Sequence, residues 1–150
     1  GGNFFMKKQY ELMNQYVADL AVLNVKFHNL HWNVVGERFE PVHVYVEKLY
    51  DMLFEQYDEV AERLKMVDVY PLASMKSYLD MTSVKEIDNK NYPIPEVYAV
   101  LKEELSGLKT LATEIRELAD EDEDFVTVAL MEDMIAEYDK ELWFINQSMK

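Results

Sequence analysis

The 150-residue chain contains no cysteine, only four glycines and only four prolines. The lack of cysteine excludes disulfide bonds and thiolate metal sites, and it is compatible with the cytoplasm, where we expect this protein to act. So few glycines and prolines disfavour a β-rich fold, which would need many turns. The abundant Ala, Leu, Glu, Lys and Met residues favour helices instead.

Long apolar runs and basic residues are also scarce. No apolar run approaches the roughly 20 residues that span a bilayer, and no signal peptide is recognisable, so we expect no membrane association. The 15 Lys and Arg residues stand against 29 Asp and Glu residues, which gives a net charge of −14. Because phosphate contacts need clustered Lys and Arg, this charge disfavours DNA binding and favours cations as partners.

The length and the 49% hydrophobic content suit one domain with one core over residues 1–150. We expect residues 1–5 to be partly foreign to the natural chain, because Met6, Lys7 and Lys8 follow them. Apolar residues recur at helical spacing in four long segments. These segments cover about 4–35, about 40–66, from near 95 to the acidic run at 120–124, and from that run to about 149.

Residues 67–94 break the helical pattern with prolines and a polar turn at 88–91. Within this connection, Leu72, Met75, Tyr78 and Leu79 could line one face of a short helix. Four long helices with two short connections and one long middle connection predict an all-α, ferritin-like four-helix bundle. The short extra helix would lie in the long connection between the second and third long helices.

Acidic residues follow one face of the second long helix. Glu47, Asp51, Asp58 and Glu62 fall within about 100° of His43 around the helix axis, on the side away from the apolar stripe. Asp58 and Glu62 form an i, i+4 pair of like charges, which a cation between them would stabilise.

The alternative is that these acids are solvated and that Glu62 pairs with Arg63 or Lys65. The spacing alone does not separate a metal-binding pair from a solvated one. The positions of the histidines favour the metal-binding interpretation of these acids. His31 ends the first helix, His43 begins the second, and the tight reversal between them brings both imidazoles to one end of the bundle. A mixed set of imidazole and carboxylate ligands suits iron or zinc. His28 is assigned a structural role.

The two sets of ligands are too far apart to meet in one chain. His43 and Asp58 are 15 residues apart, which is about 22 Å along a helix. If the second helix packs antiparallel against its own copy, with a two-fold axis near residues 51 and 52, His31 and His43 of one chain meet Asp58 and Glu62 of the other. The conventional intrachain centre needs two Glu-x-x-His motifs, and only residues 40–43 match.

The sequence HNLHWNVVGERFEPVH at 28–43, followed by YDEVAERL at 57–64, resembles the Dps proteins, which are miniferritins of the ferritin-like superfamily. The likeness extends to VKFHNLHW, YPLASMKSYL and DKELW, and it covers nearly the whole chain. It implies a homododecameric cage with ferroxidase sites at two-fold dimer interfaces. Such a cage oxidises Fe(II), preferentially with hydrogen peroxide, stores ferric mineral and protects the cell from oxidative stress.

The resemblance also implies roles for individual residues. His31 and His43 match the family's iron ligands from one subunit, and Asp58 and Glu62 match those from its partner. Position 47 is commonly Asp in the family, so Glu47 is expected to alter the second iron position. Zinc is the expected competitor.

The family pattern places a tryptophan directly after the first histidine ligand, and Trp32 occupies that position. The resemblance implies a redox-active residue beside the centre. The alternative role for Trp32 is to pack the end of the helix.

Two departures from the family pattern concern iron uptake and DNA. Family members often line a pore with acids at the start of the last helix, where this chain has Phe125 and Ala129. The preceding run, with Asp120 and Asp124, either supplies the pore or caps two helices. Some relatives bind DNA through Lys-rich tails, which this chain lacks. A nucleoid-protecting DNA-binding protein with a secondary iron site is therefore the alternative that the charge disfavours.

Overall fold

The computed structural model describes residues 6–150, so the expectation for residues 1–5 lies outside the described chain. Within it, the order of elements confirms the four long helices and the short helix of the middle connection. The helices are α1 (Lys8–Asn33), α2 (Phe39–Met66), α3 (Met75–Met81), α4 (Ile94–Glu121) and α5 (Phe125–Ser148).

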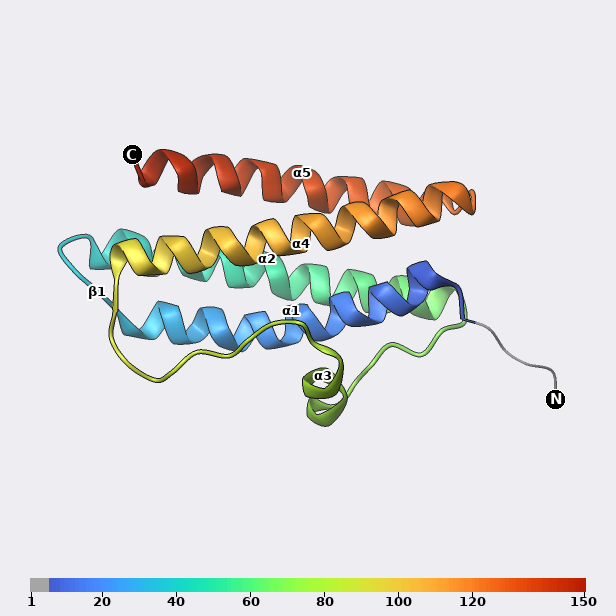
Figure 1. The fold of residues 1–150 in the computed structure, drawn as a ribbon, viewed down its shortest axis with the longest axis horizontal. Helices are drawn as coiled ribbons and strands as arrows, with labels where there is room; N and C mark the ends of the chain where they lie inside the picture. Colours follow the sequence, from blue (N-terminus) through green and yellow to red (C-terminus); the bar gives the residue numbers. More distant parts are fainter. Residues whose placement is uncertain (1–5) are drawn as a thin grey trace.

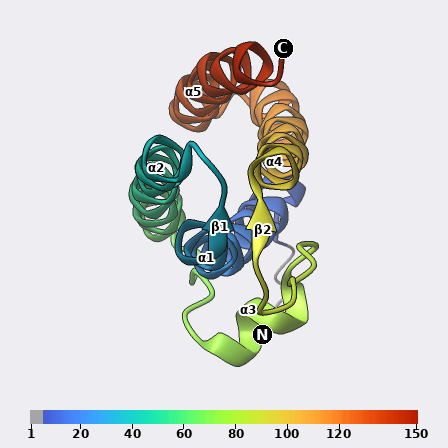
Figure 2. The same cartoon turned by 90° about the vertical axis from the view of Figure 1, so that its left-hand side faces the viewer.

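The long connection carries the chain from one end of the bundle to the other. Figure 1 shows α1 and α2 running in opposite directions, the connection with α3 returning along the bundle, and α4 then running in the same direction as α2. Figure 2 shows the four long helices around a common centre, with α3 outside α1. None of the helices in residues 6–150 has the length and apolar character that crossing a bilayer requires.

The core is formed by the apolar stripes that the sequence predicts. The stripe of α2 is buried at every expected position, and it belongs to one hydrophobic core with buried residues of the other three long helices. The α2 residues of this stripe are Val42, Val46, Leu49, Leu53, Val60 and Leu64. Because that face of α2 is committed to the core, its acidic face points out of the bundle.

Both boundaries of the first helix differ from the prediction, since Met6 and Lys7 precede the helix, which begins at Lys8. The helix ends at Asn33 rather than Val35, because Val34 and Val35 form a short strand, β1, that pairs in parallel with β2 (Tyr92–Pro93). β-branched valines favour this extended backbone, and Gly36 follows with a φ of 143°, which is costly for any other residue. The strand pair ties the α1–α2 loop to the start of α4, at the end of the bundle that carries the histidines.

Candidate iron site

His31 and His43 are held face to face by a pair of reciprocal hydrogen bonds. Their ring centroids are 3.6 Å apart and their planes are 12° from parallel. The His31 Nδ1 lies 2.7 Å from the backbone carbonyl of His43, and the His43 Nδ1 lies 2.6 Å from the backbone carbonyl of His31. A carbonyl oxygen can only accept, so each Nδ1 carries a proton and donates it.

This arrangement fixes the tautomer of both imidazoles. With Nδ1 protonated, the neutral ring presents Nε2 with its lone pair, which is the atom that binds a metal ion. A backbone carbonyl in this position is a common orienting partner of a metal-ligating histidine. His31 is only 7% exposed, so its ring has little freedom to turn away. The hydrogen bonds and the burial therefore hold the two Nε2 atoms in fixed positions, as a metal ion would require.

The helix ends explain why the two residues meet. His31 lies in the last turn of α1, where carbonyl groups lack partners within the helix and accept other donors. His43 lies in the second turn of α2, whose start is fixed by the tight loop after Gly36. The expected proximity of the imidazoles at one end of the bundle is confirmed.

His28 and Tyr50 extend this group into an aromatic cluster. The His28 Nδ1 lies 2.6 Å from the backbone carbonyl of Asn24, and the His28 ring stacks on Tyr50 with centroids 3.8 Å apart. The Tyr50 ring also meets His31 edge-on at 5.3 Å. Tyr50 was missed in the sequence, although seven residues after His43 it lies within about 20° of it around the α2 axis.

Trp32 is 68% exposed, and its ring lies 5.5 Å from that of His28. His28 is the aromatic partner of this indole among residues 6–150, and the packing alternative stays open. Its redox role stays a prediction.

Asp58 and Glu62 lie near the other end of α2, on its exposed face. A hydrogen bond with Asp58, together with the repulsion between the two charges, raises the pKa of Glu62 above its ordinary value. Arg63 and Lys65, the alternative partners of Glu62, make other contacts. The Arg63 guanidinium bonds to the α4–α5 turn, and the Lys65 ammonium lies over the Tyr70 ring at 4.7 Å. No ion pair in residues 6–150 joins either one to Glu62.

The structure of one chain leaves the two sets of ligands apart. Nowhere in the described residues do three or more His, Asp or Glu side chains gather closely enough to hold a metal ion. Glu47, one turn after His43, accepts a hydrogen bond from the Tyr50 hydroxyl at 3.3 Å. The histidines and the Asp58–Glu62 pair are thus two separate groups of side chains near opposite ends of α2.

The acidic run between α4 and α5 contains a buried structural carboxylate. Asp124 caps α5 by accepting from the Thr127 N–H, and it also accepts from the Tyr10 hydroxyl at 2.9 Å and from the Arg63 guanidinium at 2.7 Å. Its side chain is only 8% exposed. These contacts support the capping alternative for Asp124.

Burial alone would raise the pKa of the Asp124 carboxyl, but the hydrogen bonds from Thr127, Tyr10 and Arg63 outweigh burial and lower it. Asp120, in contrast, is exposed and lies 3.7 Å from the Arg116 guanidinium. A role for Asp120 in an iron pore stays a prediction.

Residues 10–150 match the ferritin-like domain family. The chain is 30% identical over 138 residues to a DNA protection during starvation protein of Helicobacter pylori, a match that covers 92% of this chain and 96% of the relative. It is 36% identical over 137 residues to the protein of that name from Listeria innocua, with 89% and 86% covered.

Among solved structures, the chain superposes with a TM-score of 0.91 and 31% identity on the Vibrio cholerae Dps protein. That match covers 95% of this chain and 89% of the other. The Vibrio protein is described as a member of a broad superfamily of ferritin-like diiron-carboxylate proteins. The expected ferritin-like fold is confirmed.

We predict that Asp124→Asn destabilises the protein by about 1–3 kcal/mol at neutral pH, because Tyr10 and Arg63 lose a charged acceptor. The folded pKa of Asp124 lies below its ordinary value of 3.8, so its contribution is present above that pH and is lost as the pH falls through the folded pKa. Thermal melting should show a difference from wild type at neutral pH that shrinks below about pH 4.

The matched control is Asp120→Asn, an exposed carboxylate of the same run, which should leave the melting temperature nearly unchanged. An Asp124→Asn protein as stable as wild type at neutral pH would show that the three hydrogen bonds contribute little.

Proposed function

The chain belongs to the ferritin-like domain family and, within it, to the Dps proteins, and we propose that it oxidises Fe(II) preferentially with hydrogen peroxide. Iron oxidation and storage are general to this family. We infer that this protein stores the ferric product in a cage and so protects its cell from oxidative stress. The observation that carries the proposal is the reciprocal His31–His43 pair, which leaves two Nε2 atoms ready for a metal ion.

A second copy of the chain would complete the site. Two α2 helices packed antiparallel about an axis near residues 51 and 52 bring the His31–His43 pair of one copy to the Asp58–Glu62 pair of the other, twice per dimer. The raised pKa of Glu62 supports this arrangement, because iron between the two carboxylates would relieve their repulsion. We propose that six such dimers form a homododecamer.

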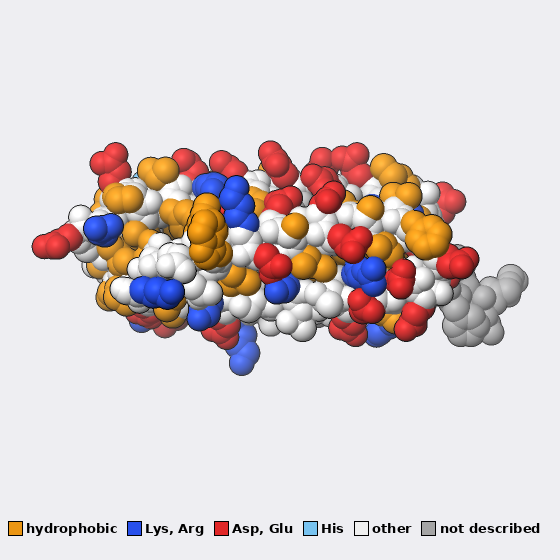
Figure 3. Space-filling model, turned by 90° about the horizontal axis from the view of Figure 1, so that it is seen from above, with side chains coloured by type: hydrophobic (Ala, Val, Ile, Leu, Met, Phe, Trp, Pro, Cys, Tyr) orange, Lys and Arg blue, Asp and Glu red, His pale blue; other side chains and the backbone are white. Residues whose placement is uncertain are grey.

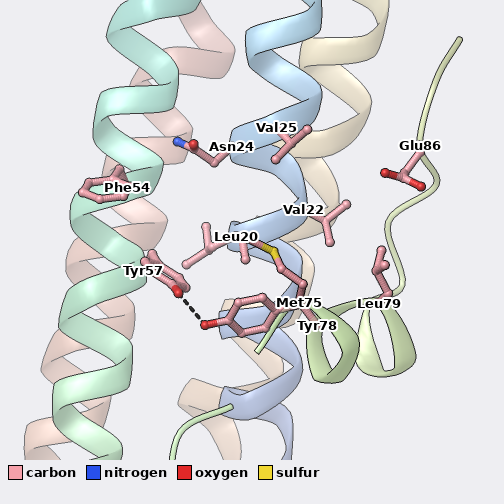
Figure 4. A pocket seen from close by; sticks show the side chains of 11 residues that line it. Leu20, Val22, Asn24, Val25, Phe54, Tyr57, Met75, Tyr78, Leu79 and Glu86 are labelled. Atoms are coloured by element: carbon pink, nitrogen blue, oxygen red, sulfur yellow. Dashed lines mark hydrogen bonds between the residues drawn. The ribbon is translucent and has the colours of Figure 1, made fainter. Parts of the chain in front are cut away.

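An exposed apolar surface beside the acidic face of α2 supports the dimer. Figure 4 shows a pocket of about 290 Å³ between α1, α2 and α3, crossed by a hydrogen bond between the Tyr57 and Tyr78 hydroxyls. Phe54 at its rim is 60% exposed and Met75 is 76% exposed. Neighbouring large apolar side chains with this exposure indicate an interaction surface, and a second copy centred near residue 51 would cover them.

The ligand types suit the proposed chemistry. Carboxylates stabilise Fe(III) as the charge of the iron rises, and the fixed imidazoles hold the iron in place. Two Fe(II) ions bound together supply the two electrons that reduce one peroxide to two waters, which avoids release of a hydroxyl radical. We propose that Glu47 contributes to the second iron position. Zinc accepts the same nitrogen and oxygen ligands and should compete.

We predict that His31→Gly combined with His43→Gly abolishes rapid Fe(II) oxidation by peroxide while the cage still assembles. Stopped-flow absorbance would measure the oxidation, and size-exclusion chromatography would measure the assembly. Oxidation kinetics equal to wild type in the double variant would refute the site.

A complementation experiment tests the shared site directly. A second variant with Asp58→Ala and Glu62→Ala should be equally inactive. When the two inactive variants are co-assembled, each mixed dimer regains one intact site, so random pairing restores about a quarter of the sites. No recovery in verified mixed cages would contradict a site shared between two copies.

Asp120→Asn should slow iron uptake at subsaturating Fe(II) if this carboxylate lines a pore, because a negative charge raises the local cation concentration. The rate of ferric core formation would measure the uptake. Glu114→Gln, at another exposed carboxylate of α4, serves as the control. Equal rates of ferric core formation in wild type and Asp120→Asn would show that Asp120 is not part of the iron-entry pathway.

Sequestration of DNA is the second candidate, since two relatives are named for DNA protection. Figure 3 shows acidic side chains along the whole length of the α5 side of the molecule, with fewer basic ones. We predict no shift of linear DNA by the assembled cage at neutral pH and physiological salt, because the net charge of −14 repels phosphate. A retarded band that persists at this salt concentration would favour the second candidate.

A further inference from the structure

Both basic residues that follow Glu62 on α2 are held away from it. Lys65, three residues on, is a helical neighbour of Glu62 and could form an ion pair with it. Its ammonium instead lies over the Tyr70 ring, 4.7 Å from the centroid. The Arg63 guanidinium bonds to the turn between α4 and α5. Among the ion pairs of residues 6–150, none includes Asp58 or Glu62.

Arg63 is held by two buried acceptors. Its Nη2 donates to the Asp124 carboxylate at 2.7 Å, and its Nε donates to the Thr127 hydroxyl at 3.1 Å. Thr127 is fully buried, and the side chains of Asp124 and Arg63 are 8% and 15% exposed. Breaking a charge-assisted pair between groups with so little contact to water is costly. The guanidinium is therefore fixed at the α4–α5 turn.

Arg116 on α4 shows what an arginine of this chain does when its neighbours are exposed. The carboxylates that it meets are at least half exposed, and one of them belongs to the adjacent residue, Glu117, at 3.1 Å. Glu62 is adjacent to Arg63 in the same way, and Glu59 lies one turn before Arg63. A released Arg63 would therefore pair with the carboxylates at and beside the proposed iron ligands.

We propose that Asp124 and Thr127 are positioning residues of the iron site, which hold Arg63 away from Asp58 and Glu62. This inference rests on the proposed function, in which these two acids bind iron. A guanidinium beside Glu62 would occupy a carboxylate oxygen that the iron needs, and its positive charge would repel Fe(II). The buried bonds prevent both effects. Asp124 thus serves the iron site without touching iron.

Metal affinity, measured apart from oxidation, tests the proposal. Co(II) takes nitrogen and oxygen ligands as Fe(II) does, and calorimetric titration of the assembled, iron-free protein measures its affinity. The variant with Asp58→Ala and Glu62→Ala gives the binding to the rest of the acidic surface, which is subtracted. Asp124→Asn should weaken Co(II) binding by about threefold to tenfold, because a neutral amide holds Arg63 less strongly and Glu62 competes for it. Thr127→Val, which removes only the acceptor of Nε, should weaken the binding by a smaller factor.

Removal of the released charge separates positioning from stability. Adding Arg63→Gln to Asp124→Asn should return the Co(II) affinity at least to that of wild type, since no guanidinium remains to compete. A purely structural role of Asp124 predicts no such rescue. Asp122→Asn is the matched control and should keep the wild-type affinity. Asp122 lies in the same turn, but its hydrogen bonds among residues 6–150 come from Lys7 at 2.8 Å and Gln9 at 2.9 Å rather than from Arg63.

Wild-type Co(II) affinity in both Asp124→Asn and Thr127→Val would overturn the proposal, and so would an affinity that stays low after Arg63→Gln is added. The variant with Asp58→Ala and Glu62→Ala keeps this failure apart from that of the proposed function. If that variant binds Co(II) as tightly as wild type, the two acids are not metal ligands. If it loses the binding while Asp124→Asn keeps it, only the positioning role is wrong.

Discussion

The paired hydrogen bonds between His31 and His43 are the interaction on which the rest of the site depends. Each imidazole donates a hydrogen bond from its Nδ1 to the backbone carbonyl of the other residue. The two bonds join the end of α1 to the start of α2 and also fix both tautomers. The turn at Gly36 and the β1–β2 pairing hold the two helix ends at the required separation. The same two bonds thus join the helix ends and orient the two Nε2 atoms, so a change in the loop would alter the placement of both rings.

A second feature on which the proposed site depends is the pair of carboxylates near the C-terminal end of α2. Asp58 and Glu62 lie together on an exposed face, and the hydrogen bond between them, together with the repulsion of their charges, raises the pKa of Glu62. The repulsion could be relieved by a basic side chain of the same molecule, but Arg63 is committed to Asp124. The acids therefore remain available for a cation, and the neighbouring apolar surface with Phe54 remains available for a second copy. Under the proposed function, neither group of ligands is complete without a second copy of the chain.

Helical periodicity and ligand spacing were sufficient to predict the bundle, the buried stripe of α2 and the meeting of His31 with His43. These rules apply within one helix or across one short loop, where the number of residues between two positions nearly determines their relative placement. The β1–β2 pair and the contacts of Asp124 were not predicted, because they join segments that are distant in sequence. Tyr10, Arg63 and Asp124 come from three different elements, and no spacing rule relates them. Their contacts depend on how the helices pack.

Glu47 stands where the family commonly has Asp, and its longer side chain connects the acidic face of α2 to the aromatic cluster around the histidines. An Asp at this position would be one methylene shorter, and its carboxylate would lie farther from the hydroxyl one turn along the helix. The Glu47 side chain reaches Tyr50, whose ring contacts both His28 and His31. The carboxylate can then serve either a metal ion or a phenol, though not both at once. An iron ion that binds Glu47 would therefore have to compete with this hydrogen bond for the same carboxylate.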